Sequence, residues 1–244
     1  MINPYNQKGF TLIELVLIIL LLGVIASVAV RNMSTSINTS QHEHTKQELD
    51  QLAYAIAGNE QVYTNGSRTD FGYIGDVGSL PPNLQALYTN PGGYTSWDGP
   101  YITNGTANND YLKDAWSIDY VLSSTSIRST GSGSNIDKDF AASSAALLSN
   151  NLNGYIIDAS GQAPGDIYKD SLNVRMQYPN GSGGYSTISV IPDKAGNFAF
   201  SSLPIGVHTL SVIYIPDSDT VTYSVAIEPE SSNKLAITFP ADLF

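Results

Sequence analysis

The chain of 244 residues carries 22 acidic and 11 basic side chains and has a net charge of −11 at pH 7. Such an acidic balance argues against nucleic acid as a partner. Cysteine is absent, so disulfides cannot contribute to stability. The chain also lacks a phosphate-binding loop and a Gly-x-Ser-x-Gly motif, and it has only three histidines. We therefore expect a protein that is not an enzyme.

The first predicted element is an apolar helix that begins at Phe10 and stays apolar to Val30. At ~1.5 Å per residue, this stretch covers ~31 Å, about the thickness of one bilayer core. Its one charged residue is Glu14. A carboxylate in a membrane span costs on the order of 2.5–3.5 kcal/mol on insertion scales, so Glu14 is expected to have a partner.

The run from Lys8 to Leu15, which reads Lys-Gly-Phe-Thr-Leu-Ile-Glu-Leu, resembles the class III signal of type IV pilins and of the pseudopilins of type II secretion. In that family a prepilin peptidase cuts after the glycine and N-methylates the new terminal residue. The resemblance implies processing between Gly9 and Phe10. It also implies that the freed amine of Phe10 pairs with Glu14 of a neighbouring subunit during assembly.

Two other interpretations of this segment remain open. A plain membrane anchor explains its length, and the run from Ala26 to Ala29 imitates the cleavage site of a secretory signal. Neither explains the Gly9-Phe10 pair followed by Glu14. The resemblance implies a prepilin leader at 1–9 and a transmembrane segment at 10–30. The protein would then cross the inner membrane once, with its bulk in the periplasm.

The helix is expected to continue to about residue 60. Leu49, Leu52 and Ile56 recur at helical spacing, which predicts an apolar stripe that packs on a globular body. His42 and His44 stand two positions apart on this helix. Their side chains therefore point about 200° apart and do not converge on one metal ion.

A small globular domain is predicted for residues 61–142. The stretches Trp97–Tyr101 and Lys113–Trp116 resemble the Trp-x-Gly-Pro-Tyr and Lys-Asp-Pro-Trp motifs of the major pseudopilin of type II secretion. In that family a later loop binds calcium, and such an ion prefers several oxygen ligands. The family's first aspartate is missing here near Ser132. The resemblance leaves three candidate calcium ligands, Asp137, Asp139 and Ser129, and the alternative is a solvated turn that binds no metal.

After a predicted linker at 143–152, residues 153–244 alternate between short apolar runs and turns, which predicts an all-β sandwich. The run from Asp193 to Leu210 resembles carboxypeptidase-regulatory-like, prealbumin-like domains. The fold class expected for the whole chain is α+β. Seven strands are expected: Gly154–Ala159, Leu172–Tyr178, Tyr185–Ile191, Asn197–Phe200, His208–Ile215, Val221–Glu228 and Leu235–Phe239.

Together these resemblances imply a structural pseudopilin that assembles into the filament of a type II secretion system. Its expected partners are copies of itself, other pseudopilins, the prepilin peptidase and an inner-membrane assembly platform. The alternative is a type IV pilin, minor pilin or adhesin whose sandwich binds a glycan, a surface or a secreted protein. Four tyrosines of the sandwich are the candidate contacts for such binding: Tyr178, Tyr185, Tyr214 and Tyr223.

Overall fold

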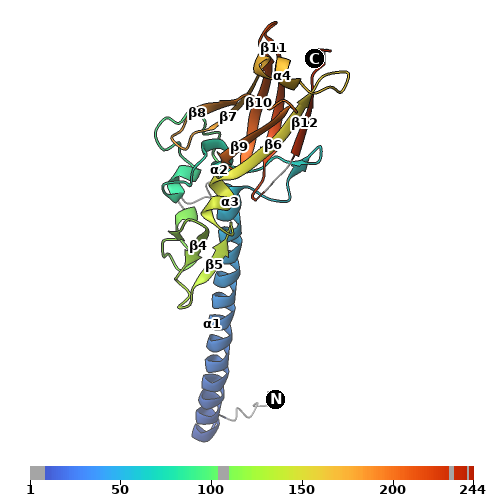
Figure 1. The fold of residues 1–244 in the computed structure, drawn as a ribbon. Coiled ribbons are helices and arrows are strands. Elements are labelled where there is room, and N and C mark those ends of the chain that lie inside the picture. Colours follow the sequence, from blue (N-terminus) through green and yellow to red (C-terminus); the bar gives the residue numbers. More distant parts are fainter. Residues whose placement is uncertain (1–8, 104–109, 231–233, 241) are drawn as a thin grey trace, which may run out of the picture. The chain divides into compact units, whose positions relative to one another are not determined.

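The computed structural model describes residues 9–103, 110–230, 234–240 and 242–244, so most of the predicted leader lies outside the described residues (Figure 1). The chain divides into two compact units, Met1–His44 and Thr45–Phe244, and each is described by itself. Helix α1 (Leu12–Ala57) supplies the described secondary structure of the first unit and contributes its last turns to the second.

Helix α1 ends at Ala57, where Gly58 and Arg68 donate hydrogen bonds to carbonyl groups of the last turn. Gly58 adopts a left-handed φ of 78°, and its amide donates to the Tyr54 carbonyl at 2.8 Å. A Cβ at Gly58 would lie 2.2 Å from the Asp70 carbonyl oxygen, so only glycine fits. The Arg68 guanidinium donates to the Ala57 carbonyl at 2.6 Å, which places a cation at the negative end of the helix dipole.

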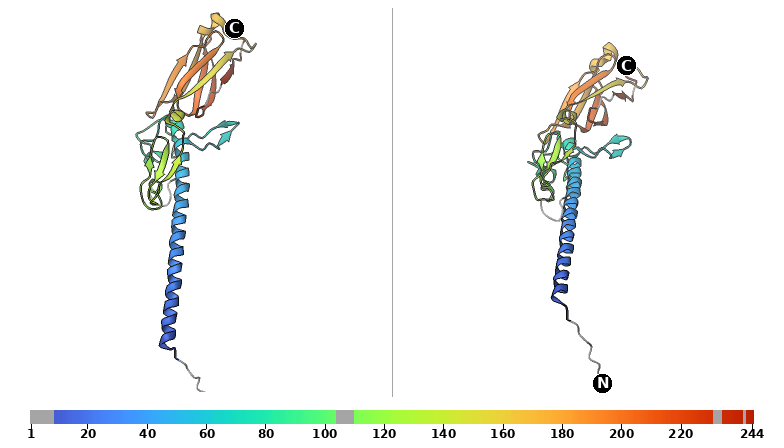
Figure 2. Two further views of the ribbon diagram at one scale, coloured as in Figure 1. Left: turned by 60° about the horizontal axis from the view of Figure 1, so that its bottom comes forward. Right: turned by 90° about the horizontal axis from the view of Figure 1, so that it is seen from below.

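The part of the second unit that follows α1 is built from short elements around one core. The predicted apolar stripe is observed, because Leu49, Leu52 and Ile56 are buried in that core together with Ile74 and Ile127. The β1–β2 hairpin stands out from its surroundings in both views of Figure 2. The elements are β1 (Tyr63–Thr64), β2 (Ser67–Arg68), α2 (Gly72–Val77), η1 (Leu84–Leu87), η2 (Asp110–Leu112), β3 (Val121–Leu122), β4 (Ser126–Ser129) and β5 (Ile136–Asp139).

The C-terminal elements form the predicted sandwich of two sheets. One sheet has the order β11-β10-β7-β8, and the other has the order β12-β6-β9, in which β12 runs parallel to β6. Buried side chains at alternate positions, such as Val174 and Met176 of β7, form the second core. The elements are α3 (Ser144–Leu148), β6 (Asn150–Ile157), α4 (Gly165–Tyr168), η3 (Lys169–Ser171), β7 (Leu172–Pro179), β8 (Tyr185–Val190), β9 (Asn197–Leu203), β10 (Gly206–Tyr214), β11 (Asp219–Ile227) and β12 (Lys234–Thr238).

The α+β architecture is thus confirmed, and each of the seven predicted strands is present. Their ends differ from the predicted ones by a few residues. The largest difference is at β6, which begins at Asn150 rather than Gly154. The prediction missed these residues because Asn150, Asn151 and Asn153 are polar and resemble a loop, whereas in the structure Asn150 pairs across to Leu203 of β9.

Residues 143–152, the predicted linker, are ordered by contacts to both sides. Ser143 caps α3 by accepting from the Ala146 amide at 3.1 Å. The buried Asn150 side chain donates to the Ala146 carbonyl at 3.0 Å and accepts from the Glu230 amide at 2.9 Å. The Ile205 amide donates to the Leu147 carbonyl at 2.9 Å, and the Ile205 side chain belongs to the first core. The sandwich is therefore joined to the preceding part by shared packing.

A half-buried carboxylate is enclosed by aromatic rings in the first core. The Tyr101 hydroxyl donates to Asp76 at 2.8 Å and accepts from the Asp98 amide at 3.1 Å. The Tyr101 ring also meets the rings of Tyr73 and Trp97 edge to face, each with centroids 5.7 Å apart. Burial raises the pKa of Asp76 to about 6, and the hydrogen bond from Tyr101 opposes part of this shift.

This raised pKa gives a testable pH dependence. Between the ordinary pKa of 3.8 and about 6, the folded state retains a proton on Asp76 that the unfolded chain has lost. Folding stability contributed by Asp76 therefore falls as pH rises through this window. Asp76→Asn keeps an acceptor for Tyr101 and does not titrate, so its melting temperature relative to the unaltered protein should increase from about pH 4 to pH 7.

The measurement is thermal unfolding of the full chain in detergent micelles, followed by circular dichroism across this pH range. Asp217→Asn removes an exposed carboxylate and controls for the change in net charge. A difference between Asp76→Asn and the unaltered protein that stays constant with pH would contradict the assignment.

Candidate assembly and processing site

The candidate site lies at the start of α1, where a short motif fixes the first turn. Glu14 Oε2 accepts hydrogen bonds from the Thr11 amide and the Thr11 hydroxyl, both at 2.9 Å. The Glu14 amide in turn donates to the Thr11 hydroxyl at 3.3 Å. This reciprocal pattern is a capping box, which satisfies donors that a helix start leaves open. Gly9 and Phe10 precede it and are exposed.

The helix that follows Thr11 carries an unusual surface. Its large apolar side chains are exposed from Leu12 to Val30. Among the described residues, α1 is the one helix with the length and apolarity to cross a membrane. Such a surface fits membrane anchoring. The arrangement therefore places one carboxylate, Glu14, in the first turn of an apolar helix, directly after the predicted cleavage point.

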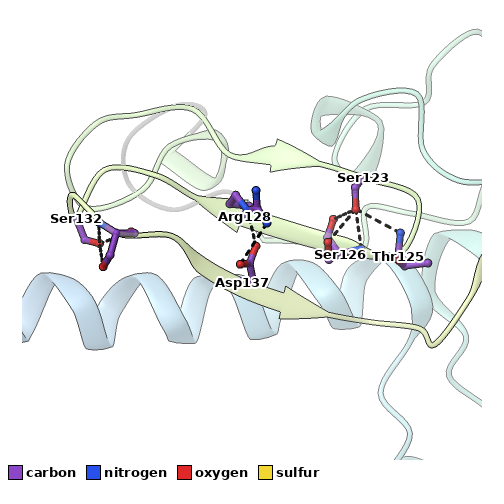
Figure 3. Close-up of polar contacts among 7 residues, drawn as sticks. Ser123, Thr125, Ser126, Arg128, Ser132 and Asp137 are labelled. Carbon is purple, nitrogen blue, oxygen red and sulfur yellow. Dashed lines mark hydrogen bonds and ion pairs between the residues drawn. The ribbon is translucent and has the colours of Figure 1, made fainter.

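The predicted calcium ligands are not brought together around one point. Asp137 on β5 pairs with Arg128, the residue directly opposite on β4 (Figure 3). Ser129 points to the other side and donates its hydroxyl to Asp114 at 2.6 Å. Asp139 is exposed at the end of β5. Among the described residues there is no group of three or more His, Cys, Asp or Glu side chains that could hold a metal.

These three side chains do not fit a shared calcium ion in this arrangement, because one is paired with a cation and another faces a buried carboxylate. Calcium binding stays a prediction of the family resemblance. In the loop between β4 and β5, the Ser132 hydroxyl donates to the Ser134 carbonyl at 2.6 Å (Figure 3). A local turn therefore forms where the family's first aspartate is missing.

The aspartate of the Lys113–Trp116 motif, to which the sequence assigned no role, holds the loop between β4 and β5 in place. Asp114 is only 5% exposed. Its Oδ1 accepts from the amides of Trp116 at 3.0 Å and Ile118 at 2.9 Å. Its Oδ2 accepts from the Ser129 hydroxyl at 2.6 Å and the Gly131 amide at 3.0 Å. Asp114 thus links the turn after η2 to β4 and the start of the following loop.

The four tyrosines predicted as binding contacts do not form one surface. Tyr214 is buried in the core of the sandwich, and Tyr178 and Tyr223 are half-buried against that core. The Tyr178 ring meets His208 with centroids 6.3 Å apart. Tyr185, at the start of edge strand β8, is 56% exposed. The strand pairing places Tyr223 opposite the buried Leu210, so both point inward.

The comparisons with known proteins agree with this geometry. A family model, the prokaryotic N-terminal methylation motif, matches residues 4–30. This chain carries the N-terminal methylation motif. The match includes Gly9, Phe10 and Glu14 and ends where the apolar segment ends. It covers a small part of the chain, so it characterises the N-terminus alone.

Two curated proteins are similar to longer parts of the chain. The type II secretion system core protein G of Xanthomonas campestris pv. campestris is 28% identical over 111 residues, which is 46% of this chain and 64% of that protein. The type IV major fimbrial protein FimA of Dichelobacter nodosus is 35% identical over 69 residues, which is 28% of this chain and 41% of that protein. The chain thus spans less than two thirds of the length of either relative.

Solved structures are similar only at a low level. A DUF3823 family protein from Bacteroides uniformis has a TM-score of 0.27 at 13% identity and covers 37% of this chain and 42% of that one. BcpA, the major pilin subunit of Bacillus cereus, has a TM-score of 0.22 at 12% identity and covers 50% of this chain and 41% of that one. The similarity to secretion and fimbrial proteins therefore comes from the sequence comparisons.

The contacts of Asp114 predict a large effect on stability. Asp114→Ala leaves buried donors without acceptors, at a cost of about 1–3 kcal/mol for each unsatisfied group. We expect a loss on the order of 3 kcal/mol after partial rearrangement. Asp137→Ala breaks only an exposed ion pair and should cost about 1 kcal/mol or less.

Urea unfolding of the two variants in detergent micelles measures this difference in the free energy of unfolding, and equal losses would contradict the role given to Asp114.

Calcium binding can be tested with the same unfolding measurement. A rise in the stability of the unaltered protein with added calcium, lost in Asp137→Ala and Asp139→Ala, would support the calcium prediction.

Proposed function

We propose that this chain is a structural subunit of a type II secretion pseudopilus. The observation that carries the proposal is the arrangement at the N-terminus: Gly9 and Phe10 directly before a helix whose apolar, membrane-length segment contains one carboxylate, Glu14. The similarity to the type II secretion core protein G covers 111 residues, against 69 for the fimbrial protein, and this longer match favours this system over a pilus.

In the proposed pathway the leader faces the cytoplasm, and a prepilin peptidase cleaves between Gly9 and Phe10. The protein is then anchored in the inner membrane by residues 10–30, with residues from about 31 onward in the periplasm. Copies of the chain, together with other pseudopilins, are added to a filament at an inner-membrane assembly platform. The proposed role is structural, and the two relatives are named as a type II secretion core protein and a major fimbrial protein.

The pairing of charges explains how the subunits keep register. In a single chain, Glu14 has Thr11 as a partner, but hydrogen bonds from an amide and a hydroxyl leave its net negative charge uncompensated. The ammonium of Phe10 in a neighbouring subunit would compensate this charge inside the membrane. Each subunit offers an amine and a carboxylate at different points, so the contact is heterologous, and a heterologous contact that does not close into a ring generates a fibre.

A type IV pilin or adhesin is the second candidate, favoured by the fimbrial relative. Removing residues 153–244 would not separate the two functions. Ile205 contributes to the first core, and its amide bonds to Leu147, so the truncation would damage the part that remains. Single substitutions on the outer surface of the sandwich avoid this problem.

The assembly proposal predicts the behaviour of two Glu14 variants. Glu14→Ala and Glu14→Gln should insert into the membrane and be cleaved after Gly9, but should be absent from sheared filaments, because neither offers a charge to the Phe10 amine. Glu14→Gln preserves size and hydrogen bonding and so isolates the charge. The measurement is immunoblotting of membrane and filament fractions. Filaments with a normal content of Glu14→Gln would contradict the pairing.

A further inference from the structure

The outer face of the three-stranded sheet carries a lysine and several asparagines, in a chain that is acidic overall. Strand β6 lies between β9 and β12, with Asn153 paired to Ala199 on one side and Lys234 on the other. Side chains alternate along each strand, so one set covers the core and the other faces outward. The outward set on these strands holds no carboxylate: Asn151, Asn153, Tyr155, Ile157, Asn197, Ala199, Ser201, Lys234, Ala236 and Thr238.

A hollow of about 510 Å³ lies on this face. Its floor includes Ala199, whose side chain is a single methyl group, and the backbone of Gly154, whose missing side chain would point into the core. Its sides include the amides of Asn153 and Asn197 and the ammonium of Lys234. The lining residues are Asn153, Gly154, Asn197, Phe198, Ala199 and Lys234. The volume is within the range of small-molecule sites.

Lys234 is a positive charge held in place without an anionic partner. Its Nζ lies 5.3 Å from the centre of the Tyr155 ring, in a cation–π contact. Within the described part of the chain, no carboxylate lies at ion-pair distance from Lys234. Other basic residues do have such partners, for example Lys113 with Asp119 and Lys138 with Asp50. Lys234 is therefore the group on this face that can pair with an external anion.

Asn197 is oriented by a neighbouring carboxylate. Its Nδ2 donates to both oxygens of Asp193, at 3.2 and 3.0 Å. Asp193 also accepts from the amides of Ala195 and Asn197, both at 2.8 Å, so its oxygens are engaged by donors of its own turn. With its nitrogen engaged in this way, the Asn197 carbonyl oxygen is the group of this side chain left to accept from a ligand hydroxyl.

We propose that this hollow binds a saccharide that carries a carboxylate, a sugar of the uronic acid class. The carboxylate pairs with Lys234, and the ring hydroxyls bond to the side-chain amide of Asn153, which donates and accepts, and donate to the side-chain oxygen of Asn197. The C–H face of the sugar ring rests on the small residues of the floor. Tyr155 acts as a positioning residue for Lys234. Binding here does not depend on assembly of the chain into a filament.

The test is isothermal titration of the full chain in detergent micelles with trigalacturonic acid as the probe. Saturable binding is expected. Lys234→Gln should weaken it by about tenfold or more, whereas Lys169→Gln, which alters a lysine in η3, should leave it unchanged. The neutral galactose trimer should bind at least about tenfold more weakly than the acid.

Both lysine variants are expected to keep their melting temperature, because Lys234 is exposed and Lys169 takes part only in a surface ion pair. A second variant, Asn197→Ala, tests the hydroxyl contact, and Tyr155→Leu tests the positioning role. Absence of binding at about 10 mM probe would overturn the proposal. Equal affinity of Lys234→Gln, of the neutral trimer or of an acidic peptide would overturn it as well.

Discussion

The cost of a charge in an apolar helix is the constraint on which the proposed biology of this chain depends. Glu14 occupies the first turn of α1, and its carboxylate is engaged by Thr11 through two hydrogen bonds to a single oxygen. These bonds stabilise the helix start but leave the charge itself uncompensated in a membrane. A neighbouring ammonium is the natural partner, and the proposed cleavage before Phe10 would provide one. In the proposed function, processing, membrane insertion and assembly are thereby linked through one side chain.

Within the second unit, the C-terminal sandwich packs directly against the part of the chain that precedes it. Ile205, from the turn between β9 and β10, lies in the same core as Leu49 and Leu52 of α1. The Gly181 amide donates to the Val77 carbonyl of α2 at 2.8 Å, and the buried Asn150 bridges α3 to the sandwich. The sandwich therefore contributes to the packing of the part that precedes it, and its outer face remains open for contacts elsewhere.

The sequence predicted the features that depend on local pattern. Alternating apolar residues identified all seven strands of the sandwich, and the spacing of Leu49, Leu52 and Ile56 identified the buried stripe of α1. The Thr-x-x-Glu spacing of Thr11 and Glu14 is likewise a local signal, and it is typical of the capping box seen at the start of α1. Features that depend on distant contacts were missed. Asp114 holds its loop through hydrogen bonds from Ser129 and Gly131, which are distant in sequence. The orientation of the tyrosines depends on the register of strand pairing, which turns Tyr214 and Tyr223 toward the core.

The most direct test of the account is mass spectrometry of the subunit in purified filaments, with peptides that cover the N-terminus. The account predicts an abundant subunit that begins at Phe10 and carries one N-methyl group. A subunit that still begins at Met1, in cells with an active prepilin peptidase, would contradict the processing step and with it the pairing of Phe10 and Glu14.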